Sequence, residues 1–97
     1  MKGKESKLVN GSPVAAFLTA AINSCSKSQL QIAAEVGFPT PNIITMLKQG
    51  RTKLPLTKVK ALADSLDTDP KVLLKMCFEE YQPENWAAIQ DIFGVKL

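Results

Sequence analysis

The segment from Ser28 to Lys53, SQLQIAAEVGFPTPNIITMLKQGRTK, constrains the fold of this chain more than any other stretch. It contains two short runs with apolar residues at helical spacing, separated by a turn that includes a glycine. The first run, residues 29–36, places three apolar side chains on one face: Ile32, Ala33 and Val36. Ser28 is its predicted N-cap, because a serine hydroxyl can accept a hydrogen bond from a first-turn N–H. Gly37 is the predicted end, because the chain leaves a helix most easily with a positive φ.

The second run is predicted to be a helix over residues 41–48. Thr40 is its expected N-cap, and Pro41 suits the first helical position because its φ is already helical and no N–H is needed there. Ile43 and either Met46 or Leu47 are expected to face the core. The side chains expected to face outward are those of Thr40, Asn42, Thr45 and Lys48 or Gln49. Two helices joined this tightly predict a helix-turn-helix unit.

This unit resembles the Cro/C1-type (XRE-like) helix-turn-helix family of bacterial and phage transcriptional regulators, which includes the phage lambda repressor. Four residues at the spacing typical of that family carry the resemblance: Gln29, Ala33, Gly37 and Ile43. The resemblance covers about residues 12–74. It implies an all-α, five-helix lambda-repressor-like DNA-binding domain whose third helix lies in the major groove, and the extra C-terminal helix of this chain follows it.

The resemblance also implies roles for residues in and around the second helix. Base edges would be contacted by Thr40, Asn42, Ile44 and Thr45. Phosphates would be bound by Gln29, Lys48, Gln49, Arg51 and Lys53. Three cations within six residues favour phosphate contact over simple solvation. Pro41, Ile44 and Leu47 replace residues that are polar in many family members, and this departure favours weaker base reading or an apolar surface for a protein partner.

The charge of the chain is unevenly distributed, although the net charge is only +3. Residues 1–11 are rich in lysine and are expected to form a flexible basic N-terminal arm. Residues 12–56 contain four cations and one carboxylate, whereas residues 57–97 contain five lysines and seven acids. This asymmetry favours a polyanionic partner at the N-terminal half of the chain.

The sequence offers little for catalysis or metal binding. It has no histidine, which removes the usual general base of Ser-His and Cys-His catalysis. Cys25 and Cys77 are an incomplete zinc site and are predicted to be packing thiols. No enzyme activity, metal or cofactor is therefore predicted. No apolar run approaches the ~18 residues of a membrane span and no signal peptide is evident, so a cytoplasmic location is expected.

Three further helices complete the predicted domain of residues 12–81. They cover residues 13–24 after the N-cap Ser12, residues 57–66, and residues 70–81 after the N-cap Asp69. Their expected core side chains are Val14, Phe17, Leu18, Ala21, Ile22 and Cys25 in the first, Val59, Leu62, Ala63 and Leu66 in the second, and Val72, Leu73, Met76 and Cys77 in the third.

Residues 82–97 are predicted to be a C-terminal helical extension, with a helix over residues 84–93 that ends at Gly94. Its apolar face carries Trp86, Ile89, Ile92 and Phe93. An isolated helix this short is marginal in water, so it must pack on something. Two alternatives stay open: it covers the core of its own chain, or it contacts a partner, most simply its copy in a homodimer.

The sequence therefore predicts a protein that binds double-stranded DNA in a sequence-specific manner and regulates transcription, as a repressor and a homodimer. The alternative is a protein-interaction module, antitoxin-like or antirepressor-like, that keeps the fold but reads DNA weakly.

Overall fold

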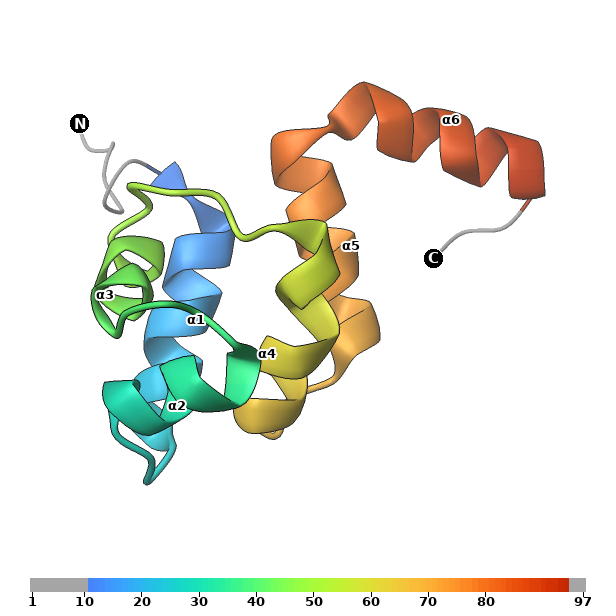
Figure 1. Cartoon of the computed structure of the whole chain (residues 1–97). Coiled ribbons are helices and arrows are strands. Elements are labelled where there is room, and N and C mark those ends of the chain that lie inside the picture. Colours follow the sequence, from blue (N-terminus) through green and yellow to red (C-terminus); the bar gives the residue numbers. More distant parts are fainter. Residues whose placement is uncertain (1–10, 95–97) are drawn as a thin grey trace.

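The computed structural model describes residues 11–94, and all regular secondary structure in this range is helical (Figure 1). The elements are α1 (Pro13–Ser24), α2 (Gln29–Val36), α3 (Asn42–Lys48), the 3₁₀-helix η2 (Leu56–Lys58), α4 (Val59–Ser65), α5 (Pro70–Tyr81) and α6 (Pro83–Phe93). The predicted all-α fold is confirmed for this part of the chain. The predicted basic arm lies outside the described residues, except for Gly11. None of the helices in residues 11–94 combines the length and apolarity that crossing a membrane requires.

Local signals in the sequence set the ends of four helices. The side chains of Ser12, Ser28 and Asp69 each accept a hydrogen bond from a first-turn N–H, and these bonds begin α1, α2 and α5. Gly37 ends α2 with a φ of 89°, and Gly94 ends α6 with a φ of 67°. The predicted bounds of α1, α2 and α5 are confirmed. α6 begins one residue earlier than predicted, because Pro83 takes its first position.

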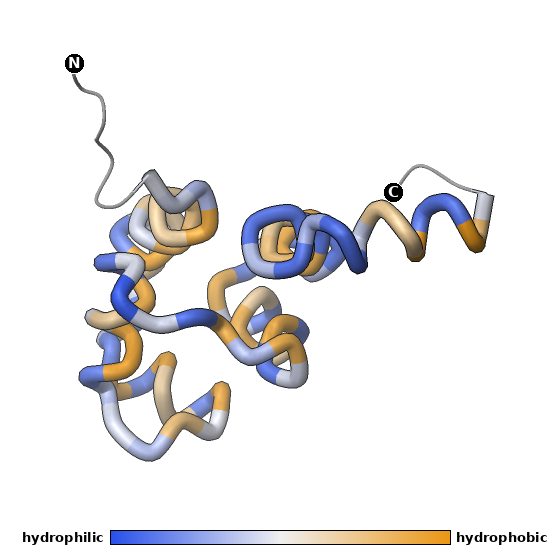
Figure 2. The backbone as a smooth tube through the Cα atoms, turned by 90° about the horizontal axis from the view of Figure 1, so that it is seen from above, coloured by the Kyte–Doolittle hydropathy of each residue, from blue (hydrophilic) through white to orange (hydrophobic). Residues whose placement is uncertain are grey.

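Helices α1 to α5 share one hydrophobic core. α1 packs against α3 and α5, α2 packs against α3 and α4, and α4 packs against α5. Figure 2 shows hydrophobic residues, in orange, alternating with hydrophilic residues, in blue, along the helical tube. The buried core residues are Val14, Leu18, Ile22, Ile32, Ala33, Val36, Ile44, Leu47, Leu54, Val59, Leu62, Ala63, Leu66, Leu73 and Cys77. Most of the predicted core side chains of α1, α2, α4 and α5 are therefore confirmed.

The structure corrects the predicted orientation of α3. Ile44 is 0% exposed and Leu47 is buried with it, whereas Ile43 is only partly buried. Ile43 does pack against the core, and Leu47 is buried, as predicted, but the side chain that inserts fully is that of Ile44, which was expected to face the DNA. Ile43, Ile44, Met46 and Leu47 are all apolar, so periodicity alone allowed two faces and the contacts with α1 and α2 selected one. The predicted Thr40 cap is also wrong, since no side-chain hydrogen bond caps α3.

Two other expectations are corrected in the second half of the domain. The helix predicted over residues 57–66 is divided into η2 and α4, and the four core residues predicted for it all lie buried. Val72 is 47% exposed, although it was expected in the core. The buried side of α5 runs through Leu73 and Cys77, which are one helical turn apart, and Val72 lies off that side.

α6 packs against α5 and points away from the other helices (Figure 1). The ring of Trp86 stacks on that of Phe78 in α5, with the centroids 5.3 Å apart and the planes 19° from parallel. Trp86 was predicted to belong to a dimer or partner surface, and this prediction is wrong. The side chain is only 7% exposed and joins α6 to its own chain. The reason is that Pro83 starts α6 directly after α5, and the first turn of α6 brings the indole back onto Phe78.

The corrected orientation of α3 predicts unequal effects for two neighbouring isoleucines. Ile44→Ala should lower the free energy of unfolding by about 2–5 kcal/mol, because it leaves a cavity in the core. Ile43→Ala is the matched control and should cost roughly 1 kcal/mol or less, because Ile43 is partly exposed. Urea denaturation followed by circular dichroism measures both. An equal or larger loss for Ile43→Ala would contradict this orientation.

Candidate nucleic-acid interface

α2 and α3 are fixed to each other by a side-chain hydrogen bond. Gln29, the first residue of α2, donates from Nε2 to Oγ1 of Thr45 in the middle of α3, at 2.8 Å. The turn between the helices is held as well, because the N–H groups of Gly37 and Phe38 both donate to the carbonyl of Ala33, each at 2.9 Å. The structure therefore brings together two of the predicted site residues, Gln29 and Thr45, in one defined arrangement.

The start of α3 presents polar side chains to solvent. Thr40 and Asn42 are exposed, and Thr45 is half-buried beside Gln29. These three side chains are accessible to a ligand that lies along the outer face of α3. Ile44 is not, because it is fully buried in the core. Its predicted contact with a base is therefore corrected: the helix turns that side chain toward α1 and α2 and away from solvent.

A short basic loop follows α3 and is held at both ends. Here the basic loop means residues 50–54. At its start Gly50 has a φ of 70°, and the N–H of Arg51 donates to the carbonyl of Met46 at 3.0 Å. At its end Leu54 is buried, and its N–H donates to the hydroxyl of Tyr81 at 3.1 Å. The backbone of the loop is therefore held in a defined conformation by hydrogen bonds at both of its ends.

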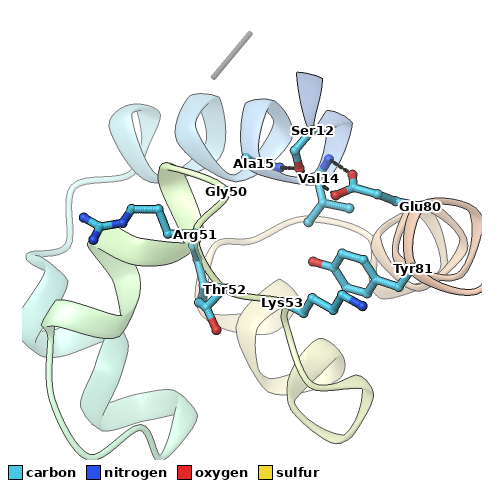
Figure 3. Close-up of a pocket in the computed structure, with 10 residues that line it drawn as sticks. Ser12, Val14, Ala15, Gly50, Arg51, Thr52, Lys53, Glu80 and Tyr81 are labelled. Carbon is cyan, nitrogen blue, oxygen red and sulfur yellow. Dashed lines mark hydrogen bonds between the residues drawn. The ribbon is translucent and has the colours of Figure 1, made fainter. Parts of the chain in front are cut away.

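The cations of this region lie on α3 and the basic loop. Lys48 is half-buried, while Arg51 and Lys53 are exposed. Nη1 of Arg51 donates to Oε1 of Gln49 at 3.3 Å, and Nζ of Lys53 lies 5.7 Å from the ring centroid of Tyr81. Figure 3 shows the Lys53 side chain extending along that ring, whereas Arg51 points away from it. Four of the predicted phosphate-binding residues therefore form one continuous stretch of the chain: Lys48, Gln49, Arg51 and Lys53. The fifth, Gln29, lies on α2, where it is bonded to Thr45 of α3.

A cavity of about 340 Å³ lies between the basic loop, the start of α1 and the end of α5 (Figure 3). The Glu80 carboxylate beside this cavity accepts hydrogen bonds from Ser12 Oγ at 2.7 Å and from the N–H of Val14 at 2.9 Å. A carboxylate suits this position, because the N-terminus of a helix favours negative charge. The first turn of α1 is thereby bonded to the last turn of α5.

Sequence reasoning missed both Glu80 and Tyr81 as residues that support this region. Val14 lies 66 residues from Glu80 in the chain, and Leu54 lies 27 residues from Tyr81. A helix-end glutamate and tyrosine have no local pattern that indicates such distant backbone partners. Burial raises the pKa of the Tyr81 hydroxyl above its ordinary value, so this group stays protonated at neutral pH.

Glu35 in α2 joins three segments of the chain. Its Oε1 accepts hydrogen bonds from Lys27 Nζ and from Ser65 Oγ, each at 2.7 Å, and its Oε2 accepts one from Gln31 Nε2 at 3.0 Å. Lys27 also donates to the carbonyl of Ser65 at 2.8 Å, which links the α1–α2 connection to α4. The hydrogen bonds from Lys27, Ser65 and Gln31 lower the pKa of Glu35 from 4.5 to about 2.

The two cysteines pack in the domain and are free thiols. Cys77 is buried in the core and Cys25 is partly buried against it, as predicted. Burial raises the pKa of the Cys77 thiol to about 11, so this group is a neutral, unreactive thiol at physiological pH. Within residues 11–94, no cluster of three or more His, Cys, Asp or Glu side chains is arranged to hold a metal ion.

Comparisons of the chain with models of protein families, with curated proteins and with solved structures each give no match.

The lowered pKa of Glu35 predicts a specific loss of stability in acid. Because this pKa is lower in the folded than in the unfolded chain, its contribution to stability is complete above about pH 4.5 and decreases as the pH falls toward 2. Urea denaturation at pH 6 and pH 3 measures the loss. Glu35→Gln should be less stable than the wild type at pH 6. Its free energy of unfolding should also decrease less than that of the wild type between pH 6 and pH 3. Equal losses for the two proteins would contradict this assignment.

Proposed function

We propose that this protein binds double-stranded DNA in a sequence-specific manner and acts as a transcriptional repressor, with α3 in the major groove. In this proposal α1 to α5 correspond to the lambda-repressor-like domain of the Cro/C1-type family. The hydrogen bond between Gln29 and Thr45 is the observation that carries the proposal. A helix that reads base edges must be held firmly by the helix before it, which crosses the DNA backbone, and this bond fixes the start of α2 to the middle of α3.

The proposed base-reading residues are Thr40, Asn42 and Thr45. An asparagine amide can bond to both N6 and N7 of adenine, and a threonine methyl can contact the methyl group of thymine. Asn42 is exposed at the first position of α3, where such an amide has room to reach a base. Because Thr45 Oγ1 is engaged by Gln29, its methyl group is the part we assign to base contact.

The proposed phosphate-binding residues flank α3 on two sides. Lys48 is the last residue of α3, Gln49, Arg51 and Lys53 follow the helix, and Gln29 begins α2. In the proposed complex the basic loop runs along the sugar-phosphate backbone, where exposed cations release counterions and contribute most of the non-specific affinity. Contacts with phosphates from both sides would fix the position of α3 along the groove.

The proposed function is tested by selecting binding sites from random duplexes and titrating the selected site at two salt concentrations. We expect an enriched motif that is bound at least ~10³-fold more tightly than bulk DNA. Asn42→Ala should cost about 1–3 kcal/mol of binding free energy at one base position and relax specificity there. Arg51→Ala should weaken binding to all sequences alike and reduce the salt slope by about one unit.

The two variants serve as controls for each other, because one is assigned to sequence and the other to charge. Equal, sequence-independent losses from both would contradict the assigned roles. If no motif is enriched and binding to all DNA stays weak, the protein is not a sequence-specific regulator. The favoured function would then be that of a protein-interaction module, antitoxin-like or antirepressor-like.

We also propose that the protein forms a homodimer through α6. Ile92 and Phe93 are 78% and 71% exposed near the end of this helix, and Ile89 lies half-buried beside them. These three residues are the α6 surface; Trp86 is excluded from it, because it is buried against Phe78. A second copy is the occupant that suits the proposed function, since two half-sites related by a two-fold axis match two copies of a DNA-binding domain.

The homodimer is tested by placing a charge on the α6 surface. Phe93→Lys should shift the protein toward the monomer, because a lysine would be buried between two apolar helices. Ala87→Lys is the matched control: it adds the same charge at an exposed position on the opposite side of the same helix, and it should leave the dimer intact. Sedimentation equilibrium measures the dissociation constant. A wild-type protein that remains monomeric at high micromolar concentration would contradict the homodimer.

A further inference from the structure

Tyr81 makes two contacts with the basic loop from the last position of α5. Its hydroxyl accepts a hydrogen bond from the N–H of Leu54 at 3.1 Å. The face of its ring lies under the Lys53 ammonium, with 5.7 Å between Nζ and the ring centroid. Figure 3 shows the Tyr81 ring beside the loop backbone and the Lys53 side chain alongside it. One side chain of α5 is therefore in contact with two successive residues of the loop.

The backbone of the loop needs such an anchor at its C-terminal end. Its N-terminal end is bonded to α3 through the N–H of Arg51. At the other end, Leu54 is 1% exposed and Pro55 has no N–H to donate, so the N–H of Leu54 is the donor available just before η2 begins. Without an acceptor for this buried N–H, the backbone would have to move toward water. Lys53, which lies between the two anchors, would move with it.

We infer that Tyr81 is a positioning residue for the phosphate contacts of the basic loop: it holds the loop backbone and the Lys53 ammonium in place for a DNA phosphate. This inference rests on the proposed function and deepens it, because it adds a residue that touches no phosphate itself but supports the residues that do. The physical advantage is preorganisation. A loop that is already ordered loses less conformational freedom on binding, so more of the electrostatic attraction appears as affinity.

Tyr81→Phe tests the inference with a minimal change. The phenyl ring can still lie under Lys53, but the N–H of Leu54 loses its acceptor. We expect hydrogen exchange at the Leu54 amide to become at least about tenfold faster, because the loop opens locally. Affinity for duplex DNA at low salt should fall roughly threefold to tenfold, and the plot of log K against log salt should become shallower. The ratio of affinities for the selected and a scrambled site should not change.

Two comparisons separate positioning from a general loss of stability. Thr68→Val is the matched control, because it removes a hydroxyl that bonds to the Ala63 carbonyl at 3.4 Å, at the end of α4 and outside the loop. It should leave the salt slope and the Leu54 exchange rate unchanged. In a background of Arg51→Gln with Lys53→Gln, adding Tyr81→Phe should cause little further loss of affinity, because the groups that it positions are gone.

The outcomes for Tyr81 and for DNA binding are distinguishable. If the wild type binds duplexes with a steep salt slope and Tyr81→Phe keeps both that slope and slow Leu54 exchange, the role of Tyr81 is overturned and DNA binding stands. An undiminished effect of Tyr81→Phe in the Arg51→Gln, Lys53→Gln background also overturns it. If the wild type shows no salt-dependent duplex binding, the proposed function fails, and the role of Tyr81 fails with it.

Discussion

The insertion of Ile44 and Leu47 into the core is the packing contact on which the rest of the structure depends. α3 has only seven residues, which is too short for a helix to be stable by itself in water. Burial of these two side chains against α1 and α2 holds the helix in place, and the opposite face is then left for polar residues. The hydrogen bond from Gln29 to Thr45 further constrains the orientation of α3, because it limits how far α3 can rotate relative to α2.

A second level of support comes from the end of α5. Glu80 bonds to the first turn of α1, and Tyr81 bonds to the basic loop. Two adjacent residues therefore tie the last helix of the core to its first helix and to the loop after α3. Since α6 starts directly beyond these residues, the position of its exposed apolar end relative to the proposed DNA surface is set at the same place in the chain. In the proposed function, the same region would connect dimer formation with DNA contact.

The accuracy of prediction from the sequence differed between the parts of the fold for physical reasons. Helix ends were predictable where a side chain acts on its own backbone, as Ser28 does at α2, because such contacts need no distant partner. The orientation of α3 was not predictable in this way. Four of the five residues from 43 to 47 are apolar, so an apolar face can be drawn on more than one side of the helix. Trp86 was misassigned for a related reason: an apolar face on a short helix shows that something covers it, but not whether that is the same chain.

The sequence by itself determined the all-α fold of residues 11–94, most of the core positions, and the polar and basic character of the segment around α3. These properties follow from periodicity, capping and charge, which are local. Only the tertiary structure decided that Ile44 is buried, that Gln29 bonds to Thr45, and that Tyr81 holds the basic loop. Each of these contacts joins residues whose positions relative to one another are fixed only when the helices pack together, and so no local pattern in the chain could specify them.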